Sequence, residues 1–235
     1  MTISSPHMPG PASRPPAWVG SVGGPLVVVP ASALARWAGC TAGGMVNSDA
    51  GTPDDYDRAC AVDDLAGVLV MGEDCSQALV LADEPARSCY LPEHRAFLRR
   101  LAADSESDLL AAAEAVLDDP ATEWEECGTW RTDGQAVLMD SADAGADLGV
   151  EYPNEGGLPE QAPVPVPAGF WNVRATHISG DEDTWVGLVQ LLPAPAENPG
   201  GGNAVKRSAG SSRLTGESGK RFGDETIRGT PDGER

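Results

Sequence analysis

Three carboxylates stand close together in the first half of the chain: Asp54, Asp55 and Asp57, in the run Asp-Asp-Tyr-Asp. Carboxylate oxygens bind hard cations such as Mg²⁺, and they also pair with basic groups on a protein partner. The run lacks the glycine and the distal glutamate of an EF-hand loop, and its spacing fixes no further ligand. We therefore expect a solvated acidic loop that can contact a partner, with a small metal-dependent enzyme as the weaker alternative.

A second acidic segment, Glu123-Trp-Glu-Glu126, surrounds a tryptophan. In an extended strand, Glu123 and Glu125 share one face while Trp124 points to the other, because side chains alternate along a strand. The result is an acidic outer face over an aromatic anchor, which suits contact with a basic protein surface. The candidate partner-binding residues are therefore Glu123 and Glu125 together with Asp54, Asp55 and Asp57.

Residue types that catalyse reactions are otherwise sparse. His94 and His177 are the only histidines of residues 17–195, and the spacing pairs neither with a nucleophilic cysteine. The 5 cysteines are odd in number and show no Cys-x-x-Cys pair and no spacing with histidine that is typical of zinc. We expect no catalytic residue, no metal site and no cofactor, and hence a protein that is not an enzyme. Reduced cysteines favour a cytoplasmic location.

The elements that must position these residues are mostly strands. Short apolar runs rich in valine and leucine, bounded by turn residues, predict strands within 23–30, 67–71, 78–82 and 88–91, the second and third forming a pair. Two hairpins are predicted further on, one joining 123–131 to 135–140 through Thr-Asp-Gly, the other joining 169–178 to 184–192. In the latter, Trp171, Val173 and Ala175 share one face. The proline-rich connector before it predicts an edge strand at 164–166.

Two helical regions complete the pattern. Ser32 is a candidate N-cap for a short helix near 32–38 that Gly39 closes. Pro92 opens a longer region, the segment Ser105–Asp108 resembles a capping box that restarts the helix, and Pro120 ends it. The predicted fold class is α+β: predominantly antiparallel sheet, with one long, broken amphipathic helix hairpin region near 92–119 and the short helix near 32–38.

Charge is distributed unevenly along the chain. The whole chain has a formal charge of −20, yet residues 1–195 alone carry 9 arginines against 30 acidic residues, a charge of −21. Such acidity excludes nucleic acid and anionic membrane as direct partners, because both need a basic surface. A biased genomic composition would produce the same acidity without any binding role.

Composition also predicts the domain organisation. Residues 1–16 and 196–235 are poor in large apolar residues and rich in Gly, Ser, Pro or Arg, which predicts two disordered tails around a single domain at 17–195. The longest apolar run, around 25–34, is too short to span a membrane, and the first ten residues lack the pattern of a signal peptide. Both observations agree with the expected cytoplasmic location.

Several short motifs follow one another in a characteristic order. They include Trp18-Val-Gly20 (Trp-x-Gly) and Tyr56-Asp-Arg-Ala-Cys60 (Tyr-x-x-x-Cys), together with the phrases at 23–30, 83–86 and 185–190. In these motifs the chain resembles the immunity protein 21 family of bacterial polymorphic toxin systems, over roughly residues 18–193. The resemblance supplies no active-site residues. We expect Trp18, Gly20, Tyr56 and Cys60 to hold the fold rather than to bind a partner.

The resemblance implies a cytosolic protein, encoded beside a toxin, that binds and neutralises the cognate toxin domain. If that toxin is a nuclease with a basic substrate groove, an acidic inhibitor is attracted to the groove and covers it. Two other functions remain open from the residues alone. One is an acidic regulatory or assembly module with an unrelated partner, and the other is the metal-dependent enzyme that would use Asp54–Asp57.

Overall fold

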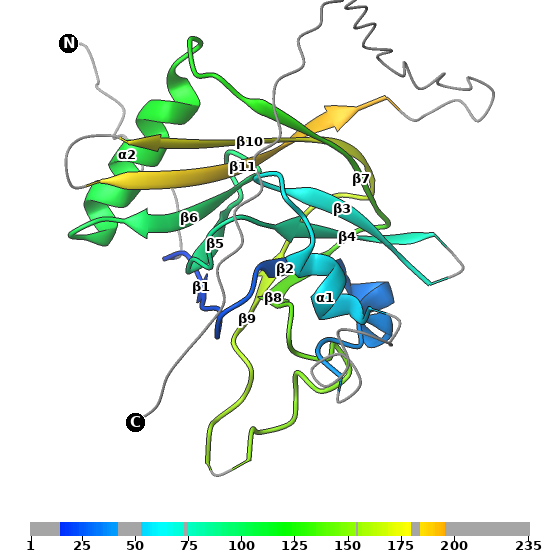
Figure 1. Cartoon of the computed structure of the whole chain (residues 1–235). Coiled ribbons are helices and arrows are strands. Elements are labelled where there is room, and N and C mark those ends of the chain that lie inside the picture. Colours follow the sequence, from blue (N-terminus) through cyan, green and yellow to red (C-terminus); the bar gives the residue numbers. More distant parts are fainter. Residues whose placement is uncertain (1–14, 42–52, 73–74, 154, 180–183, 196–235) are drawn as a thin grey trace, which may run out of the picture. The chain divides into compact units, whose positions relative to one another are not determined.

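Two antiparallel sheets carry the fold (Figure 1). The computed structural model describes residues 15–41, 53–72, 75–153, 155–179 and 184–195. The predicted tails lie almost wholly outside these ranges and stay predictions. Among the described residues, no helix is long and apolar enough to cross a membrane.

The first sheet has six strands in the order β1-β5-β6-β11-β10-β7. Its strands are β1 (Trp18–Val19), β5 (Ser88–Leu91), β6 (Ala96–Ala102), β7 (Glu125–Thr132), β10 (Gly169–Ser179) and β11 (Trp185–Ala194). The second sheet has five strands in the order β3-β4-β2-β8-β9. Its strands are β2 (Leu26–Pro30), β3 (Gly67–Met71), β4 (Ser76–Leu81), β8 (Ala136–Asp140) and β9 (Gln161–Val164).

The main apolar core joins faces of both sheets. Val28, Leu79 and Leu138 of the second sheet belong to one buried cluster with Phe97 and Val189 of the first sheet. The same cluster includes Trp171, Val173 and Ala175 of β10, so the predicted face of this strand is confirmed. Alternation along each strand is what allows one face to enter this core while the other faces away.

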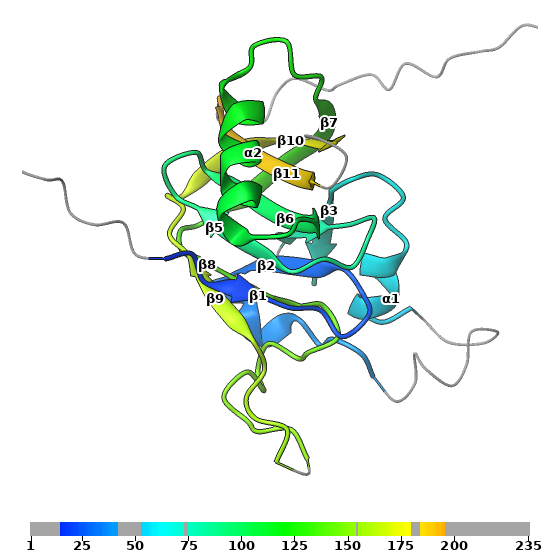
Figure 2. The same ribbon diagram turned by 90° about the vertical axis from the view of Figure 1, so that its left-hand side faces the viewer.

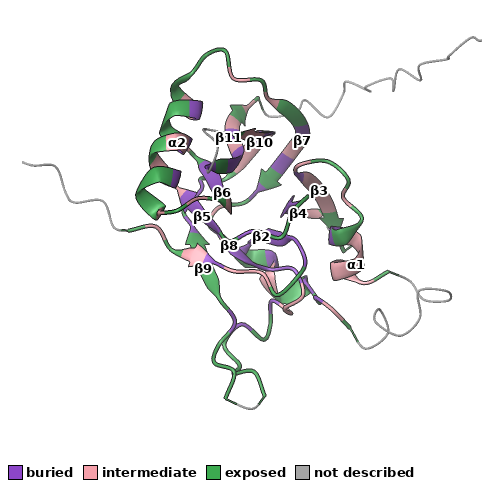
Figure 3. Cartoon of the chain, turned by 60° about the vertical axis from the view of Figure 1, so that its left-hand side comes forward, coloured by how far each residue is buried: buried purple, intermediate pink, exposed green. Residues whose placement is uncertain are grey.

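Helix α2 (Glu106–Asp118) covers the outer face of the six-stranded sheet, as Figure 2 shows. Leu109, Ala113 and Val116 recur at spacings of three and four, which places them on one face of the helix. That face is buried against Leu98 of β6 and Leu188 of β11. The opposite face of α2 is exposed (Figure 3).

Two shorter helices pack on the second sheet. They are η1 (Ala31–Arg36), a 3-10 helix, and α1 (Asp55–Cys60). A separate buried cluster there includes Val27, Trp37 and Ala59, and the indole Nε1 of Trp37 donates to the carbonyl oxygen of Ser141 at 2.9 Å. The short helix therefore exists but begins at Ala31, and the Ser32 side chain does not cap it.

The helix predicted over 92–102 is wrong. Residues 92–95 form a turn, in which Arg95 has a φ of 48°, and β6 follows directly. In β6, Phe97 enters the core between the sheets while Leu98 packs under α2, so the two neighbours fill two different apolar layers. In a helix the two side chains would point only about 100° apart, whereas a strand sends them to opposite faces. The helix after Ser105 was predicted correctly, and the Ser105 side chain accepts from the backbone N–H of Asp108.

The hairpin predicted around Thr132-Asp-Gly134 is also wrong. β7 pairs with β10 in the first sheet, and β8 pairs with β2 and β9 in the second, so the turn carries the chain from one sheet to the other. Trp130 and Leu138 consequently enter the same core from opposite sides. The strand pairs β3–β4 and β10–β11 and the strands β2 and β5 are confirmed, and the edge strand lies at Gln161–Val164 rather than at 164–166.

Candidate partner-binding site

The run Asp54–Asp57 starts helix α1 rather than forming a solvated loop. Asp54 is the N-cap: its carboxylate accepts from the backbone N–H of Asp57 at 2.9 Å, and the Asp57 carboxylate accepts from the N–H of Asp54 at 3.3 Å. This reciprocal capping box satisfies N–H groups that have no partner inside the helix. Burial alone raises the pKa of Asp54, but hydrogen bonds from Asp57 and Thr41 outweigh it, so that pKa lies below its usual value.

Asp55 is engaged as well. It accepts from the backbone N–H of Ala38 at 2.8 Å and pairs with Arg58 at 3.0 Å. All three carboxylates therefore hold α1 in place, and their role in binding a partner stays a prediction. Within the described ranges, no three His, Cys, Asp or Glu residues are grouped so that they could hold a metal ion.

The motif residues make close packing contacts. A Cβ at Gly24 would lie 2.4 Å from Cε2 of Tyr56, so the tyrosine ring rests directly on this glycine. A hydrogen bond with Cys60, and then burial, raise the pKa of Tyr56. At the other motif, Trp18 packs against the apolar cluster under α2, and the N–H of Gly20 donates to Glu160 at 2.6 Å.

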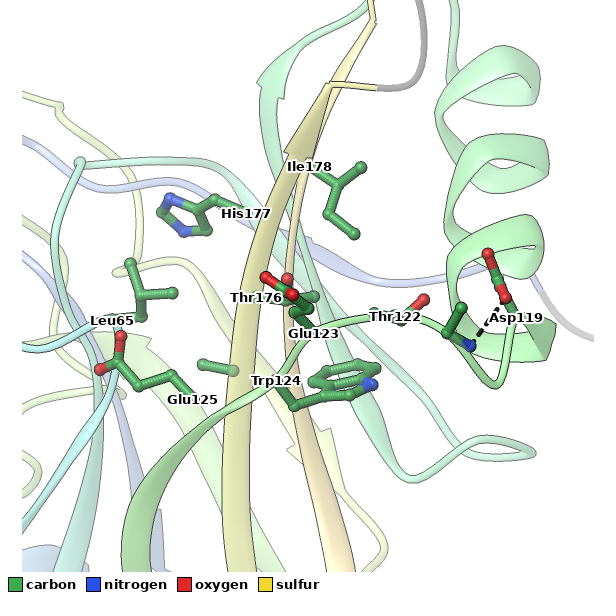
Figure 4. A pocket seen from close by; sticks show the side chains of 11 residues that line it. Leu65, Asp119, Thr122, Glu123, Trp124, Glu125, Thr176, His177 and Ile178 are labelled. Carbon is green, nitrogen blue, oxygen red and sulfur yellow. Dashed lines mark hydrogen bonds between the residues drawn. The ribbon is translucent and has the colours of Figure 1, made fainter.

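Glu123 and Glu125 line a hollow of about 620 Å³ beside β10 (Figure 4). We call it the acidic hollow. Its lining includes Leu65, Asp119, Glu123, Trp124, Glu125 and the β10 residues 175–178. Asp54, Asp55 and Asp57 do not line it, so the structure does not bring the two predicted acidic groups together there.

The predicted alternation holds in this segment, although β7 begins only at Glu125. Glu123 and Glu125 are exposed, whereas Trp124 is half-buried against the cluster under α2. The guanidinium carbon of Arg174 lies 4.3 Å from the Trp124 ring centroid, a distance that allows a cation–π interaction. The Nε and Nη2 of Arg174 both donate to Oε1 of Gln190, at 2.9 and 2.6 Å, which fixes the guanidinium in this position.

The sequence model of the family described as Immunity protein 21 matches residues 17–184. The chain belongs to this family. The match spans more than two thirds of the chain and confirms the family suggested by the motifs. No curated protein and no solved structure matches the chain at a significant level.

The matched range of this immunity protein 21 family chain includes Trp18, Gly20, Tyr56 and Cys60 and the whole acidic hollow, and only the phrase at 185–190 lies beyond it. Trp18 lies at its start and Tyr56 in its first quarter. The lining residues of the hollow, from Leu65 to Ile178, all fall inside it. The hollow therefore belongs to the part of the chain that carries the family resemblance, and not to a region added beside it.

His177 also lines the hollow, although the spacing of the sequence gives it no catalytic partner. Its Nδ1 lies 3.1 Å from the carboxylate of Asp83. Burial, and then the nearby Arg99, lower the pKa of His177, while Asp83 acts in the opposite direction. Extending the face of Trp171, Val173 and Ala175 by two residues would have placed His177 on the same side of β10.

Arg99, beside His177, is the most deeply buried charged residue described, with 1 % of its surface exposed. It stands opposite Gly187 in the strand register, and its Nη2 donates to the carbonyl oxygen of Glu84. Burial lowers the pKa of Arg99 to about 10, although Asp83 and Glu84 oppose that effect. Arg99 and Asp83 thus form a cluster of titratable groups with His177, which lines the acidic hollow.

Proposed function

We propose that this protein binds a cognate toxin domain and neutralises it by direct contact, with the acidic hollow as the contact surface. Membership of the immunity protein 21 family carries the first part of the proposal. The second part is supported by the exposed carboxylates of Glu123 and Glu125 beside a half-buried tryptophan. Binding alone performs this function, and no catalytic step is involved.

Charge favours a basic partner. The chain has a net charge of −20, and Asp119 adds a third carboxylate to the lining of the hollow. A toxin domain that acts on nucleic acid needs a basic groove for phosphates, and such a groove is complementary to this surface. Covering the groove would exclude the substrate. A nuclease is therefore the toxin class that the charge of this protein fits best.

Co-expression tests the function itself. We expect that the toxin encoded beside this chain stops growth when it is expressed alone, and that growth returns when both proteins are expressed. The two proteins should then co-purify as a 1:1 complex. Absence of both rescue and co-purification would contradict the immunity function and would favour the acidic regulatory or assembly module with an unrelated partner.

Charge reversal tests the surface. The double variant Glu123→Lys/Glu125→Lys should weaken toxin binding by about 100-fold or more, because close charge pairs at interfaces contribute several kcal/mol. Asp147→Lys/Glu151→Lys is the matched control, since it makes the same change of charge at exposed positions outside the hollow. An equal loss of affinity in both variants would show that the hollow is not the contact surface.

A further inference from the structure

One edge of β10 has no partner strand over its last residues. β7 pairs with β10 from Gly169 to Ala175 and stops there, at Glu125. β11 pairs with the other edge of β10 from Phe170 to Ser179. From Thr176 to Ile178, therefore, no strand among the described residues pairs with the edge that faces β7.

The register shows which backbone groups face this open edge. The N–H of Leu191 in β11 donates to Arg95 on the β6 side, at 2.9 Å. Since backbone groups of alternate residues point to opposite edges, the even-numbered residues of β11 bond to β10. These pair with even-numbered residues of β10, such as Leu188 with Thr176. The N–H and C=O of His177 consequently point to the open edge.

Contacts of residues 119–124, which connect α2 to β7, keep this edge of β10 unpaired. The Thr122 hydroxyl donates to the carbonyl oxygen of Val116 in α2 at 2.8 Å, and the N–H of Ala121 donates to the Asp119 side chain at 2.8 Å. The ring centroid of Trp124 lies 4.3 Å from the guanidinium carbon of Arg174. The first two contacts keep residues 119–122 near the end of α2, while Trp124 meets β10 only at Arg174, and the acidic hollow lies between this segment and residues 175–178 of β10 (Figure 4).

We propose that the toxin domain inserts an extended segment into the acidic hollow, where it pairs with the open edge of β10 at His177 as an added strand. The proposal rests on the proposed function and names its mode of contact. Unpaired strand edges are templates for such addition, and a neighbouring strand lies about 4.8 Å away. The hollow reaches both faces of β10 there, with His177 on one side and Ile178 on the other (Figure 4).

The carboxylates around the acidic hollow favour a basic inserted strand over a second copy of this chain. Glu123 and Glu125 are exposed at the hollow, and Asp119 lines it. An inserted strand that carries Lys or Arg would pair with them, whereas a second copy of this chain would bring the same acidic residues against one another. Like charges placed together cost several kcal/mol at an interface. The toxin segment is therefore basic, and the charges protect the edge from self-association.

A proline at the open edge tests the pairing. His177→Pro removes the N–H that faces the hollow but leaves the even-numbered residues bonded to β11, and proline is tolerated at strand edges. His177→Ala is the control, because it loses the imidazole and keeps the N–H. We expect His177→Pro to bind the purified toxin domain about 10-fold or more weakly than His177→Ala, a change that corresponds to one lost hydrogen bond.

Amide hydrogen exchange on the unmodified full chain gives a second measurement that does not depend on how the variants fold. The His177 amide should exchange quickly in the free protein and slowly in the complex. If the toxin binds but leaves this amide unprotected, and the two variants bind equally, strand addition is wrong while the immunity function stands. Protection that appears at high protein concentration without toxin would instead assign the edge to a second copy and overturn the proposal. Failure of the unmodified protein to bind at all would contradict the proposed function.

Discussion

At the scale of single residues, the contact between Gly24 and Tyr56 joins the Tyr-x-x-x-Cys motif to the turn before β2. A methyl group at position 24 would meet the tyrosine ring at 2.4 Å. We expect Gly24→Ala to lower the free energy of unfolding by about 1–3 kcal/mol, as overpacked positions do. Chemical denaturation measures this change directly.

A matched control exists at Gly149, where an added Cβ meets no heavy atom within 4 Å. Gly149→Ala should change the free energy of unfolding by less than about 0.5 kcal/mol. The double variant Gly24→Ala/Tyr56→Ala should be less destabilised than the sum of its single changes, because the two side chains share one space. Additive losses would mean that Gly24 acts through some other contact.

His177 makes stability depend on pH. Its pKa in the folded state is lowered, by burial first and then by Arg99, against the opposing charges of Asp83, Glu125 and Glu84. The unfolded state therefore takes up the proton first, and the free energy of unfolding falls as pH drops below about 6.5 toward the folded-state pKa. His177→Gln should lose less stability than the unmodified protein between pH 7 and that lower limit. Denaturation midpoints at several pH values measure the difference, and parallel curves for the two proteins would contradict it.

At the scale of elements, the pairing of strands that are neighbours in the sequence could be predicted. Which apolar layer a side chain enters, the core between the sheets or the layer under α2, could not. The strand pair β3–β4 and the hairpin β10–β11 join neighbours in the sequence through short turns, so their apolar patterns suffice. The spacing of Phe97, Leu98 and Leu101 fits a helix equally well. What decides for a strand is that Phe97 and Leu98 each enter a different apolar layer, one between the sheets and one under α2. Those layers are made by distant parts of the chain.

In the candidate site, too, the local features could be predicted from the sequence and those that depend on distant residues could not. The alternation of Glu123, Trp124 and Glu125 is local, so the exposed carboxylates over a half-buried indole could be predicted. The open edge of β10 could not, because the end of β7 depends on contacts between Thr122 and Val116 and between Trp124 and Arg174. The contact between Trp124 and Arg174 joins residues fifty positions apart, and no local sequence pattern predicts a contact over that separation.

At the scale of the whole molecule, the charge of −20 predicts how fast the complex forms. Opposite net charges accelerate encounter, and added salt screens that attraction beyond about 10 Å at 0.1 M ionic strength. The association rate constant with the toxin domain should therefore fall about 10-fold or more between low salt and roughly 0.5 M salt, while the dissociation rate changes less. Stopped-flow or surface-based kinetics give both constants.

The same kinetics decide whether the acidity acts locally or as a property of the whole surface. If the carboxylates of the acidic hollow steer the toxin, Glu123→Lys/Glu125→Lys should flatten the salt dependence of association and Asp147→Lys/Glu151→Lys should leave most of it. Equal flattening by both pairs would mean that steering comes from the total charge, for which a biased genomic composition is a sufficient source. Association that does not respond to salt in the unmodified protein would remove the electrostatic part of the mechanism, and contact through Trp124, Ile178 and the edge of β10 would have to hold the complex alone.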